Sequence, residues 1–159
     1  EKMAIALDRL DETDIKILRL LQQNARLTLK EIGAQVNLSS TPVYERFRRL
    51  EREGYIKAYV TVLDEEKLNM GFTAYCSVTL KQQNKANAKE FADVIMGLQE
   101  VTECYNISGR FDYLVKIQVP SMKAYREFVM NVLGCLEYVA TFESTFVMDE
   151  VKHEFGISI

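Results

Sequence analysis

One segment of this sequence combines hydroxyl, aromatic and arginine side chains with the periodicity of a helix. Val43, Phe47 and Leu50 repeat at i, i+4 and i+7, so we expect them to face a core. The side chains between them then point outward, where hydroxyl, tyrosine and arginine groups can hydrogen-bond to base edges and phosphates in a DNA major groove. The candidate DNA contacts are Ser39, Ser40, Thr41, Tyr44, Glu45 and Arg48, with Arg46, Arg49 and Arg52 placed for phosphate.

A solvated surface helix is the alternative interpretation of the same arginines. In that case their guanidinium groups pair with the acidic neighbours Glu45, Glu51 and Glu53 and contact no nucleic acid. The DNA-binding hypothesis therefore depends on the whole segment and on the elements that position it, and not on any single arginine.

Few other residues suggest chemistry. His153 is the only histidine of the sequence, and Cys76, Cys104 and Cys135 lie on apolar patterns without a histidine nearby to activate them. No HExxH, P-loop, GxGxxG or GxSxG motif is present. We therefore predict a protein that is not an enzyme, with no catalytic residue, no metal site and no cofactor.

Three helix start signals surround the arginine-rich segment. Asp11 with Asp14, and Thr28 with Glu31, have the spacing of capping boxes, and Ser39 is placed to cap a third helix. Only Asn37 and Leu38 separate the end of the second helix from Ser39, which forces a sharp angle between the last two helices, with Asn37 at a position expected to need left-handed geometry. Gly54 is expected to cap the C-terminal end of the third helix. The sequence therefore predicts a helix-turn-helix whose second helix carries the candidate DNA contacts.

The rest of the chain changes period. Alternation over 55–63 predicts a strand or ribbon, and 64–71 is a polar hinge. The segments that follow have the order βαββαβ, which predicts a four-stranded antiparallel sheet with both helices on one face. The expected strands are 72–81, 101–107, 113–119 and 138–148, and the expected helices include Phe91 to Leu98 and Ser121 to Leu136. A polar stretch over 82–87 separates the first strand from the first helix.

We therefore expect an α+β fold with an N-terminal three-helix, winged-helix-like helix-turn-helix domain and a C-terminal ferredoxin-like domain. The predicted boundaries are 1–56 for the helix-turn-helix domain, 57–71 for a strand and hinge linker, and 72–159 for the ferredoxin-like domain.

The composition is that of an ordinary globular protein, with 159 residues, 48% of them hydrophobic, and a formal net charge of -3. Residues 1–60 contain 11 Lys+Arg and 9 Asp+Glu, whereas residues 61–159 contain 9 and 14. This balance excludes a protein that coats nucleic acid with its whole surface but allows a focused basic face. With no membrane-length apolar run, no leader and an odd number of cysteines, we expect a cytoplasmic protein without a membrane partner.

Three segments carry a resemblance to a known family. Leu38–Ile56, Ser108–Leu114 and Val147–Lys152 together resemble the leucine-responsive regulatory protein (Lrp)/AsnC family of prokaryotic transcription regulators. The resemblance implies a DNA-binding helix-turn-helix followed by a ferredoxin-like domain that senses an amino acid and forms homodimers, which assemble into octamers in many relatives. The implied partners are double-stranded DNA with a pseudo-palindromic operator and a free amino acid, and the implied location is the cytoplasm, in association with the nucleoid.

The same resemblance implies an effector site near a contact between dimers. A glycine such as Gly109 lets backbone N–H groups approach a ligand carboxylate, and the Asp112 carboxylate could accept an α-ammonium group. From the loop alone, a plain β-turn is the preferred interpretation of Gly109 and Asp112, and the family resemblance is what favours an effector site at this loop. Arg110 replaces the acidic residue that is common there in relatives, so the resemblance does not imply a preference for leucine. The implied effector residues are Tyr105, Ser108, Gly109, Arg110, Asp112 and Thr145.

A second function remains open from the sequence alone. The chain could be a ligand-binding and assembly module that lacks sequence-specific DNA binding, with the helical domain serving protein contacts. The salt dependence of DNA affinity distinguishes the two functions, because each phosphate contact makes affinity fall as salt rises.

Overall fold

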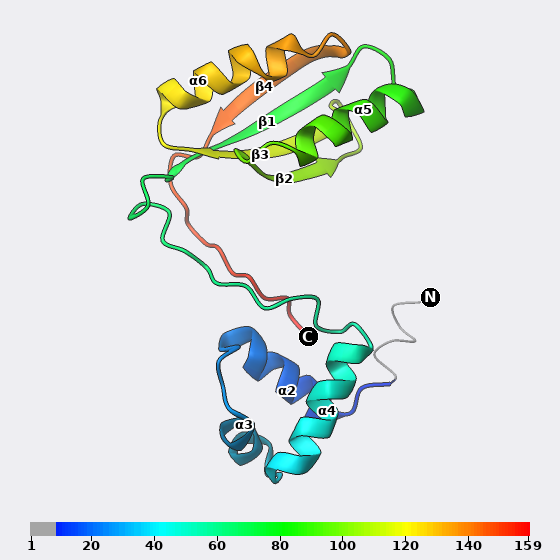
Figure 1. The fold of residues 1–159 in the computed structure, drawn as a ribbon, viewed down its shortest axis with the longest axis vertical. Coiled ribbons are helices and arrows are strands. Elements are labelled where there is room, and N and C mark those ends of the chain that lie inside the picture. Colours follow the sequence, from blue (N-terminus) through cyan, green and yellow to red (C-terminus); the bar gives the residue numbers. More distant parts are fainter. Residues whose placement is uncertain (1–8) are drawn as a thin grey trace. The chain divides into compact units, whose positions relative to one another are not determined.

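The computed structural model describes residues 9–159, so the first eight residues of the predicted N-terminal domain lie outside the described residues. The chain forms two compact units, drawn in Figure 1. The first unit contains the chain up to Val62 together with Lys152–Ile159, and the second contains Leu63–Val151. The last eight residues thus group with the first unit, whereas the predicted boundaries put them in the second domain. Within residues 9–159, no helix has the length and apolar character needed to cross a membrane.

The first unit contains the three predicted helices, α2 (Glu12–Gln23), α3 (Leu29–Val36) and α4 (Ser40–Arg52). Both predicted capping boxes are confirmed. The side chain of Asp11 accepts the backbone N–H of Asp14 at 2.8 Å, and that of Thr28 accepts the N–H of Glu31 at 3.2 Å. In each box the acidic side chain accepts the N–H of the cap residue in return. Four backbone donors that helix ends leave unpaired are satisfied in this way.

A tight turn joins α3 to α4. Asn37 ends α3 in the left-handed conformation, with φ 57° and ψ 42°, which asparagine tolerates better than most residues. Gly33 is buried one turn earlier, where a Cβ atom would collide with the carbonyl oxygen of Leu38. Ser39 occupies the predicted cap position of α4, but its side chain makes no capping hydrogen bond. The turn is therefore fixed by backbone geometry and by close packing at Gly33.

The C-terminal end of α4 has the predicted glycine cap. Gly54 has φ +78°, its N–H donates to the carbonyl of Glu51 at 3.0 Å, and the N–H of Tyr55 donates to the carbonyl of Leu50 at 3.0 Å. These two bonds define a Schellman motif, which satisfies carbonyls at the helix end.

The predicted strand over 55–63 is wrong, because these residues form no strand in the structure. A β-strand requires a backbone partner, and in the described part of the chain the sheet contains only β1 to β4 of the second unit. An alternating pattern alone is therefore not enough to make this linker a strand.

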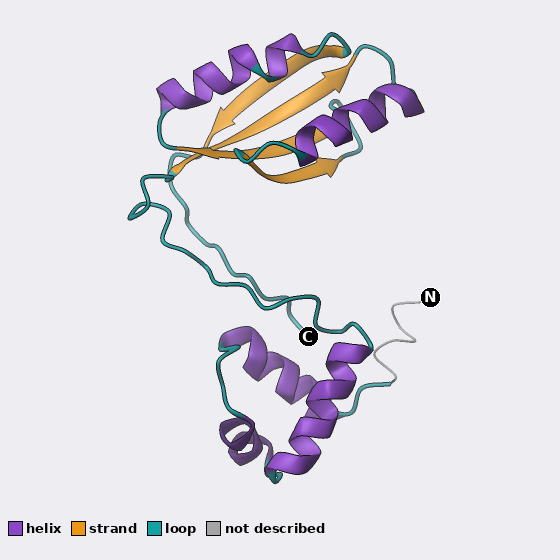
Figure 2. Ribbon diagram, in the orientation of Figure 1, coloured by secondary structure: helices purple, strands orange, loops and turns teal. Residues whose placement is uncertain are grey.

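The second unit confirms the predicted ferredoxin-like topology. Its four strands form one antiparallel sheet with the order β2-β3-β1-β4, and both helices cover the same face of the sheet (Figure 2). Its elements are β1 (Phe72–Leu80), α5 (Lys85–Met96), β2 (Val101–Asn106), β3 (Tyr113–Val119), α6 (Met122–Asn131), the short 3-10 helix η1 (Leu133–Cys135) and β4 (Val139–Phe146).

The two helices differ from expectation at their ends. Helix α5 begins at Lys85, inside a stretch that sequence reasoning interpreted as a polar loop, because the Asn84 side chain accepts the N–H of Asn87 and caps the helix. Helix α6 ends at Asn131, and the apolar residues that follow belong to η1 and the loop after it. An apolar stripe shows which side chains pack inward, but it does not locate the last helical hydrogen bond.

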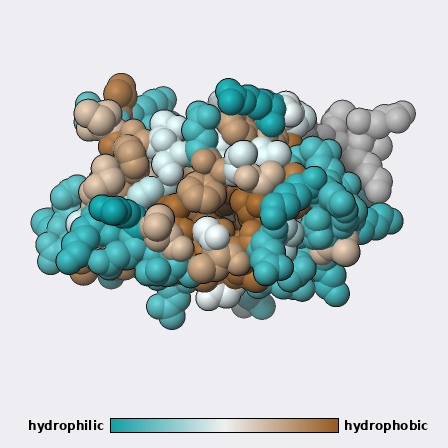
Figure 3. All heavy atoms as spheres, turned by 90° about the horizontal axis from the view of Figure 1, so that it is seen from above, coloured by the Kyte–Doolittle hydropathy of each residue, from teal (hydrophilic) through white to brown (hydrophobic). Residues whose placement is uncertain are grey.

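The core of the second unit lies between the sheet and these helices. Alternate residues of β1, from Ala74 to Leu80, are buried against Phe91 of α5 and Phe128 of α6. Figure 3 views the molecule from above, and hydrophobic side chains are visible in the middle of the face with hydrophilic ones around them. The opposite face of the sheet carries the outward residues of each strand, such as Tyr75 opposite Lys116.

Candidate nucleic-acid interface and ligand cavity

Helix α4 has two sides with different character. Val43 and Leu50 are fully buried against α2 and α3, as their spacing predicts. On the other side, five predicted DNA contacts are exposed and, at 3.6 residues per turn, lie within an arc of about 100°. Two more predicted contacts, both serines, are exposed at the N-terminal end of the helix. The five are Thr41, Tyr44, Glu45, Arg48 and Arg52, which we call the exposed face of α4, and the two serines are Ser39 and Ser40.

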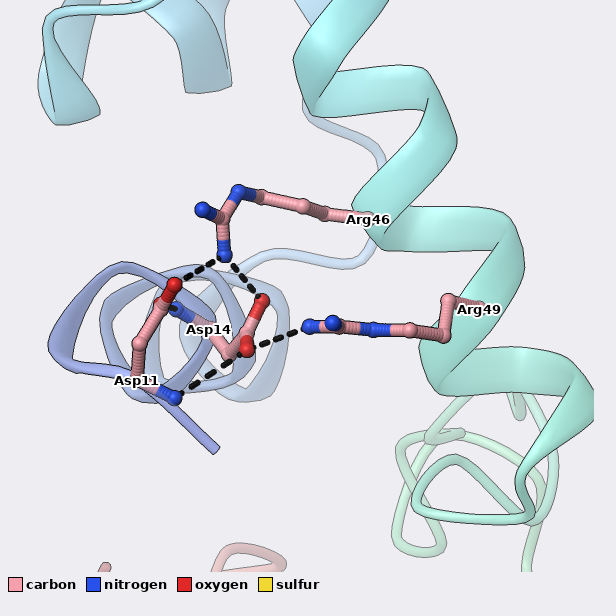
Figure 4. A network of polar contacts seen from close by, with 4 residues as sticks. All are labelled: Asp11, Asp14, Arg46 and Arg49. Carbon is pink, nitrogen blue, oxygen red and sulfur yellow. Dashed lines mark hydrogen bonds and ion pairs between the residues drawn. The ribbon is translucent and has the colours of Figure 1, made fainter. Parts of the chain in front are cut away.

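Arg46 and Arg49 lie elsewhere on the helix. Figure 4 shows both side chains extending from α4 to the start of α2. Arg46 donates to Asp11 at 2.6 Å and to Asp14 at 2.7 Å, and Arg49 donates to the other oxygen of Asp14. The structure therefore separates two of the nine predicted DNA contacts from the other seven. We call Asp11, Asp14, Arg46 and Arg49 the aspartate–arginine cluster.

The cluster favours the charged form of Arg46 and of Asp11. The pKa of Arg46 is raised by its hydrogen bonds to Asp14 and then to Asp11. The pKa of Asp11 is lowered, first because its carboxylate accepts the backbone N–H of Asp14 and then because it accepts from Arg46. The four residues form a network of ion pairs between α4 and the start of α2.

Arg48 and Tyr44 remain accessible on the exposed face. The Arg48 side chain is 61% exposed and pairs at 2.8 Å with Glu51, one turn further along the helix. An exposed pair of this kind contributes little free energy, so Arg48 can exchange Glu51 for another anion. Tyr44 is about half exposed.

Tyr59 is a neighbour of this face that sequence reasoning missed. Its ring stacks on Phe47 with centroids 6.3 Å apart, and its hydroxyl donates to Glu51 at 3.3 Å. Burial, and secondarily Glu51, raises the pKa of Tyr59 to about 12. Tyr44, Phe47 and Tyr59 also line a hollow of about 360 Å³ with residues from the start of α3. The signal for these contacts in the sequence is the alternating pattern at 55–63, because alternation places Tyr59 on a side of the chain that packs against a neighbour.

A cavity of about 420 Å³ lies in the second unit, between the β2–β3 loop and the start of α5. It contains three of the six predicted effector residues, Ser108, Gly109 and Asp112. The α5 end of the cavity was not predicted, although the polar stretch before Asn87 was a signal for it. The additional lining residues are Leu80, Gln83, Asn84, Lys85, Ala88, Asn106, Ile107, Phe111 and Tyr113.

Asp112 connects the two sides of this cavity. Its carboxylate accepts the backbone N–H of Leu80 at 2.7 Å and the side-chain amide of Gln83. Its backbone carbonyl accepts the N–H of Ile107 and the side-chain amide of Asn106, both at 2.9 Å. Within one copy, the Asp112 carboxylate therefore fixes the loop to the end of β1, while its use as an acceptor for an α-ammonium group stays a prediction.

The other three predicted effector residues do not line the cavity. The Arg110 side chain is 80% exposed, 4.0 Å from Glu143, with its guanidinium carbon 5.1 Å from the Phe111 ring centroid. Tyr105 and Thr145 belong to β2 and β4, the two opposite edges of the sheet. The hydroxyl of Tyr105 donates to Glu103 at 2.7 Å. One copy of the chain thus does not bring these side chains together with the loop.

The three cysteines differ in exposure, because Cys104 and Cys135 are exposed and the packing role expected of all three thiols holds only for Cys76. Cys76 is buried, and burial raises the pKa of its thiol to about 11. Burial also raises the pKa of Cys104. Among residues 9–159, no group of three or more His, Cys, Asp or Glu side chains is arranged to bind a metal ion.

Comparison with known proteins gives matches to both units. Residues 10–57 match a winged helix-turn-helix DNA-binding family, and residues 73–157 match the Lrp/AsnC ligand binding domain. The chain is 38% identical over 143 residues to the leucine-responsive regulatory protein of Escherichia coli, covering 90% of this chain and 87% of that protein. It is 37% identical over 142 residues to the Bkd operon transcriptional regulator of Pseudomonas aeruginosa, covering 89% and 93%.

Two solved structures resemble the fold of this chain over most of its length. A transcriptional regulator of Neisseria meningitidis in complex with L-Met has a TM-score of 0.90 and 35% identity, covering 94% of this chain and 96% of that chain. An AsnC family transcriptional regulator from Agrobacterium tumefaciens has a TM-score of 0.89 and 32% identity, covering 94% and 97%.

Proposed function

This chain belongs to the Lrp/AsnC family of transcription regulators, and we propose that it reads double-stranded DNA through the exposed face of α4 and responds to a free amino acid. The observation that carries the DNA-reading proposal is the exposed face itself. Hydroxyl, phenol and guanidinium groups lie on one side of a helix that is capped at its C-terminal end and packed on two others. Such a helix presents donors and acceptors to base edges when it lies in the major groove.

The proposed operator is pseudo-palindromic. A two-fold homodimer presents two copies of α4, so its DNA site has two related halves about one helical turn apart, roughly 34 Å, or a multiple of that distance. Ser39, Ser40 and the exposed face contact DNA in this proposal, and the first unit needs a partner copy because its basic charge is small. Dimerisation raises the effective concentration of the second helix once the first has bound.

The proposed ligand is an amino acid bound at the cavity of the second unit. The Neisseria regulator was solved with L-Met, and the E. coli relative is named for its response to leucine. In this chain the cavity offers Lys85 and the backbone at Gly109 for a carboxylate, and Asp112 for an ammonium group. Tyr105, Arg110 and Thr145 take part only if a second copy completes the site at a contact between dimers. We propose that four homodimers assemble into an octamer. The proposed location is the cytoplasm of a prokaryote, in association with the nucleoid.

The ligand and the assembly are tested together by size-exclusion chromatography with light scattering. The chain is run alone and with each of the twenty amino acids. We expect one or a few amino acids to change the measured mass, because the effector site is proposed at a contact between dimers. An unchanged mass and an unchanged melting temperature with all twenty would contradict the sensing role, and DNA binding would remain to be judged separately.

A further inference from the structure

Asp14 is a charged residue in an almost fully buried position. Its side chain is 1% exposed although it lies in the first turn of α2. One carboxylate oxygen accepts from Arg46 at 2.7 Å, and the other accepts from Arg49 and from the backbone N–H of Asp11 at 3.2 Å. Burying a carboxylate is costly unless it is paired and hydrogen-bonded. Packing of α2 against α4 therefore requires these two arginines to face Asp14.

The cluster is balanced in charge. Asp11, which is about half exposed, accepts a second hydrogen bond from Arg46 at 2.6 Å. Two carboxylates thus face two guanidinium groups, and the local charge is close to zero. Four arginines lie between positions 46 and 52, but only Arg48 and Arg52 lie outside the cluster.

The direction of the side chains separates Arg46 from Arg48. At 100° per residue, Arg48 lies about 200° around α4 from Arg46, on the other side of the helix. The exposed fraction of the side chain follows the same division, at 28% for Arg46, 35% for Arg49 and 61% for Arg48. A phosphate in contact with Arg48 would therefore not be within easy reach of Arg46.

We propose that Asp14 is a positioning residue for the DNA-reading helix. By binding Arg46 and Arg49, it fixes the orientation of α4 on α2 and withholds two positive charges from the phosphate backbone. Phosphate contact then comes from Arg52, and Arg48 stays available for base edges. This inference rests on the proposed DNA-binding function, and it predicts that four neighbouring arginines divide into two that contact DNA and two that set the angle of the helix.

A matched pair of variants tests the proposal. Arg46→Gln and Arg52→Gln make the same chemical change six positions apart on one helix. Binding to a labelled duplex of mixed sequence is measured by fluorescence anisotropy at several KCl concentrations, and log K is plotted against log salt. We expect Arg52→Gln to reduce the slope by about 0.9 for each phosphate that the variant no longer neutralises, and Arg46→Gln to leave the slope unchanged.

A second readout distinguishes positioning from simple support of the fold. The ratio of affinities for a duplex enriched by selection from a random pool and for the mixed-sequence duplex measures discrimination. We expect Arg46→Gln to lower this ratio although the slope is unchanged, because a tilted helix misplaces its base contacts. Arg49→Gln is the second variant. Each of the two substitutions leaves Asp14 paired with one arginine. Circular dichroism checks that each variant is folded.

Three results would count against the proposal or its premise. If Arg46→Gln or Arg49→Gln reduces the slope as much as Arg52→Gln, those arginines contact phosphate and the proposal is overturned. If discrimination is unchanged in folded Arg46→Gln and Arg49→Gln, the positioning role is overturned. If the unsubstituted chain shows no salt-dependent binding at all, the proposed DNA-binding function itself fails, which is a different result from either of the first two.

Discussion

At the scale of single residues, neighbouring arginines of one helix have different roles. Arg48 is exposed and has only a weak partner in Glu51, whereas Arg46 has two aspartates within 2.7 Å. The first arrangement leaves a guanidinium free to contact a base or phosphate, and the second commits it to the fold. The type of a residue therefore suggests a nucleic-acid contact, but its tertiary partners determine whether the contact is available.

Arg48→Ala should weaken binding to the preferred duplex by about 1–3 kcal/mol if Arg48 makes a bidentate contact with a base. The free energy of unfolding of the Arg48→Ala variant should change by no more than about 0.5 kcal/mol, because the Arg48 side chain is exposed. A footprinting titration measures both affinity and sequence preference, and Arg52→Ala is the comparison, since a phosphate contact lowers affinity evenly across sequences. Unchanged affinity and unchanged preference in Arg48→Ala would remove this residue from the reading role.

The difference between a residue's local pattern and its tertiary partners explains which parts of the candidate site could be predicted. The sequence showed the pattern that separates Val43 and Leu50 from the exposed face, since helical spacing is local information. It did not show that Arg46 and Arg49 face Asp14, because that depends on how α2 packs against α4. The α5 side of the ligand cavity, with Gln83 and Lys85, was missed for the same reason.

At the scale of elements, the turn between α3 and α4 depends on a glycine inside a helix. Gly33 is buried, and a Cβ atom there would collide with the carbonyl oxygen of Leu38, the residue before the cap of α4. The carbonyl is backbone and cannot rotate away without moving the turn. Close approach of the two helices therefore requires glycine at this position.

Gly33→Ala should lower the free energy of unfolding by about 1–3 kcal/mol, which is the usual cost of overpacking. This is opposite to the stabilisation of about 1 kcal/mol that alanine normally gives over glycine in a helix. Urea unfolding followed by circular dichroism measures the change. Gly97→Ala is the control, since its Cβ would meet only Val94 at an ordinary 3.5 Å. A stabilised Gly33→Ala variant would show that the turn is not constrained as described.

Elements were predictable where their signals are local. Thr28 with Glu31, Asn37 and Gly54 act within one helix turn, and the structure confirms each of them. The strand expected at 55–63 was wrong because pairing needs a second strand, which an alternating pattern cannot supply. The early start of α5 at Lys85 was missed because a polar stretch concealed an asparagine cap.

At the scale of the whole molecule, charge is divided between the two halves of the sequence. The chain has a net charge of -3, but residues 1–60 carry a small excess of positive charge. Pairing inside the aspartate–arginine cluster leaves little positive charge on each exposed face. Strong binding by one copy is therefore not expected, and two linked copies are needed for affinity and for a two-part DNA site.

Selection of bound duplexes from a random pool, followed by footprinting of the enriched sequence, tests DNA reading by paired α4 helices most directly. We predict an enriched sequence with two halves related by a two-fold axis. Their protected centres should be about 10–10.5 base pairs apart, or a multiple of that spacing. Arg48→Ala should lose preference at a defined position in each half. A pool that stays random while the protein binds DNA, or protection without a repeated half-site, would contradict sequence-specific reading by paired α4 helices.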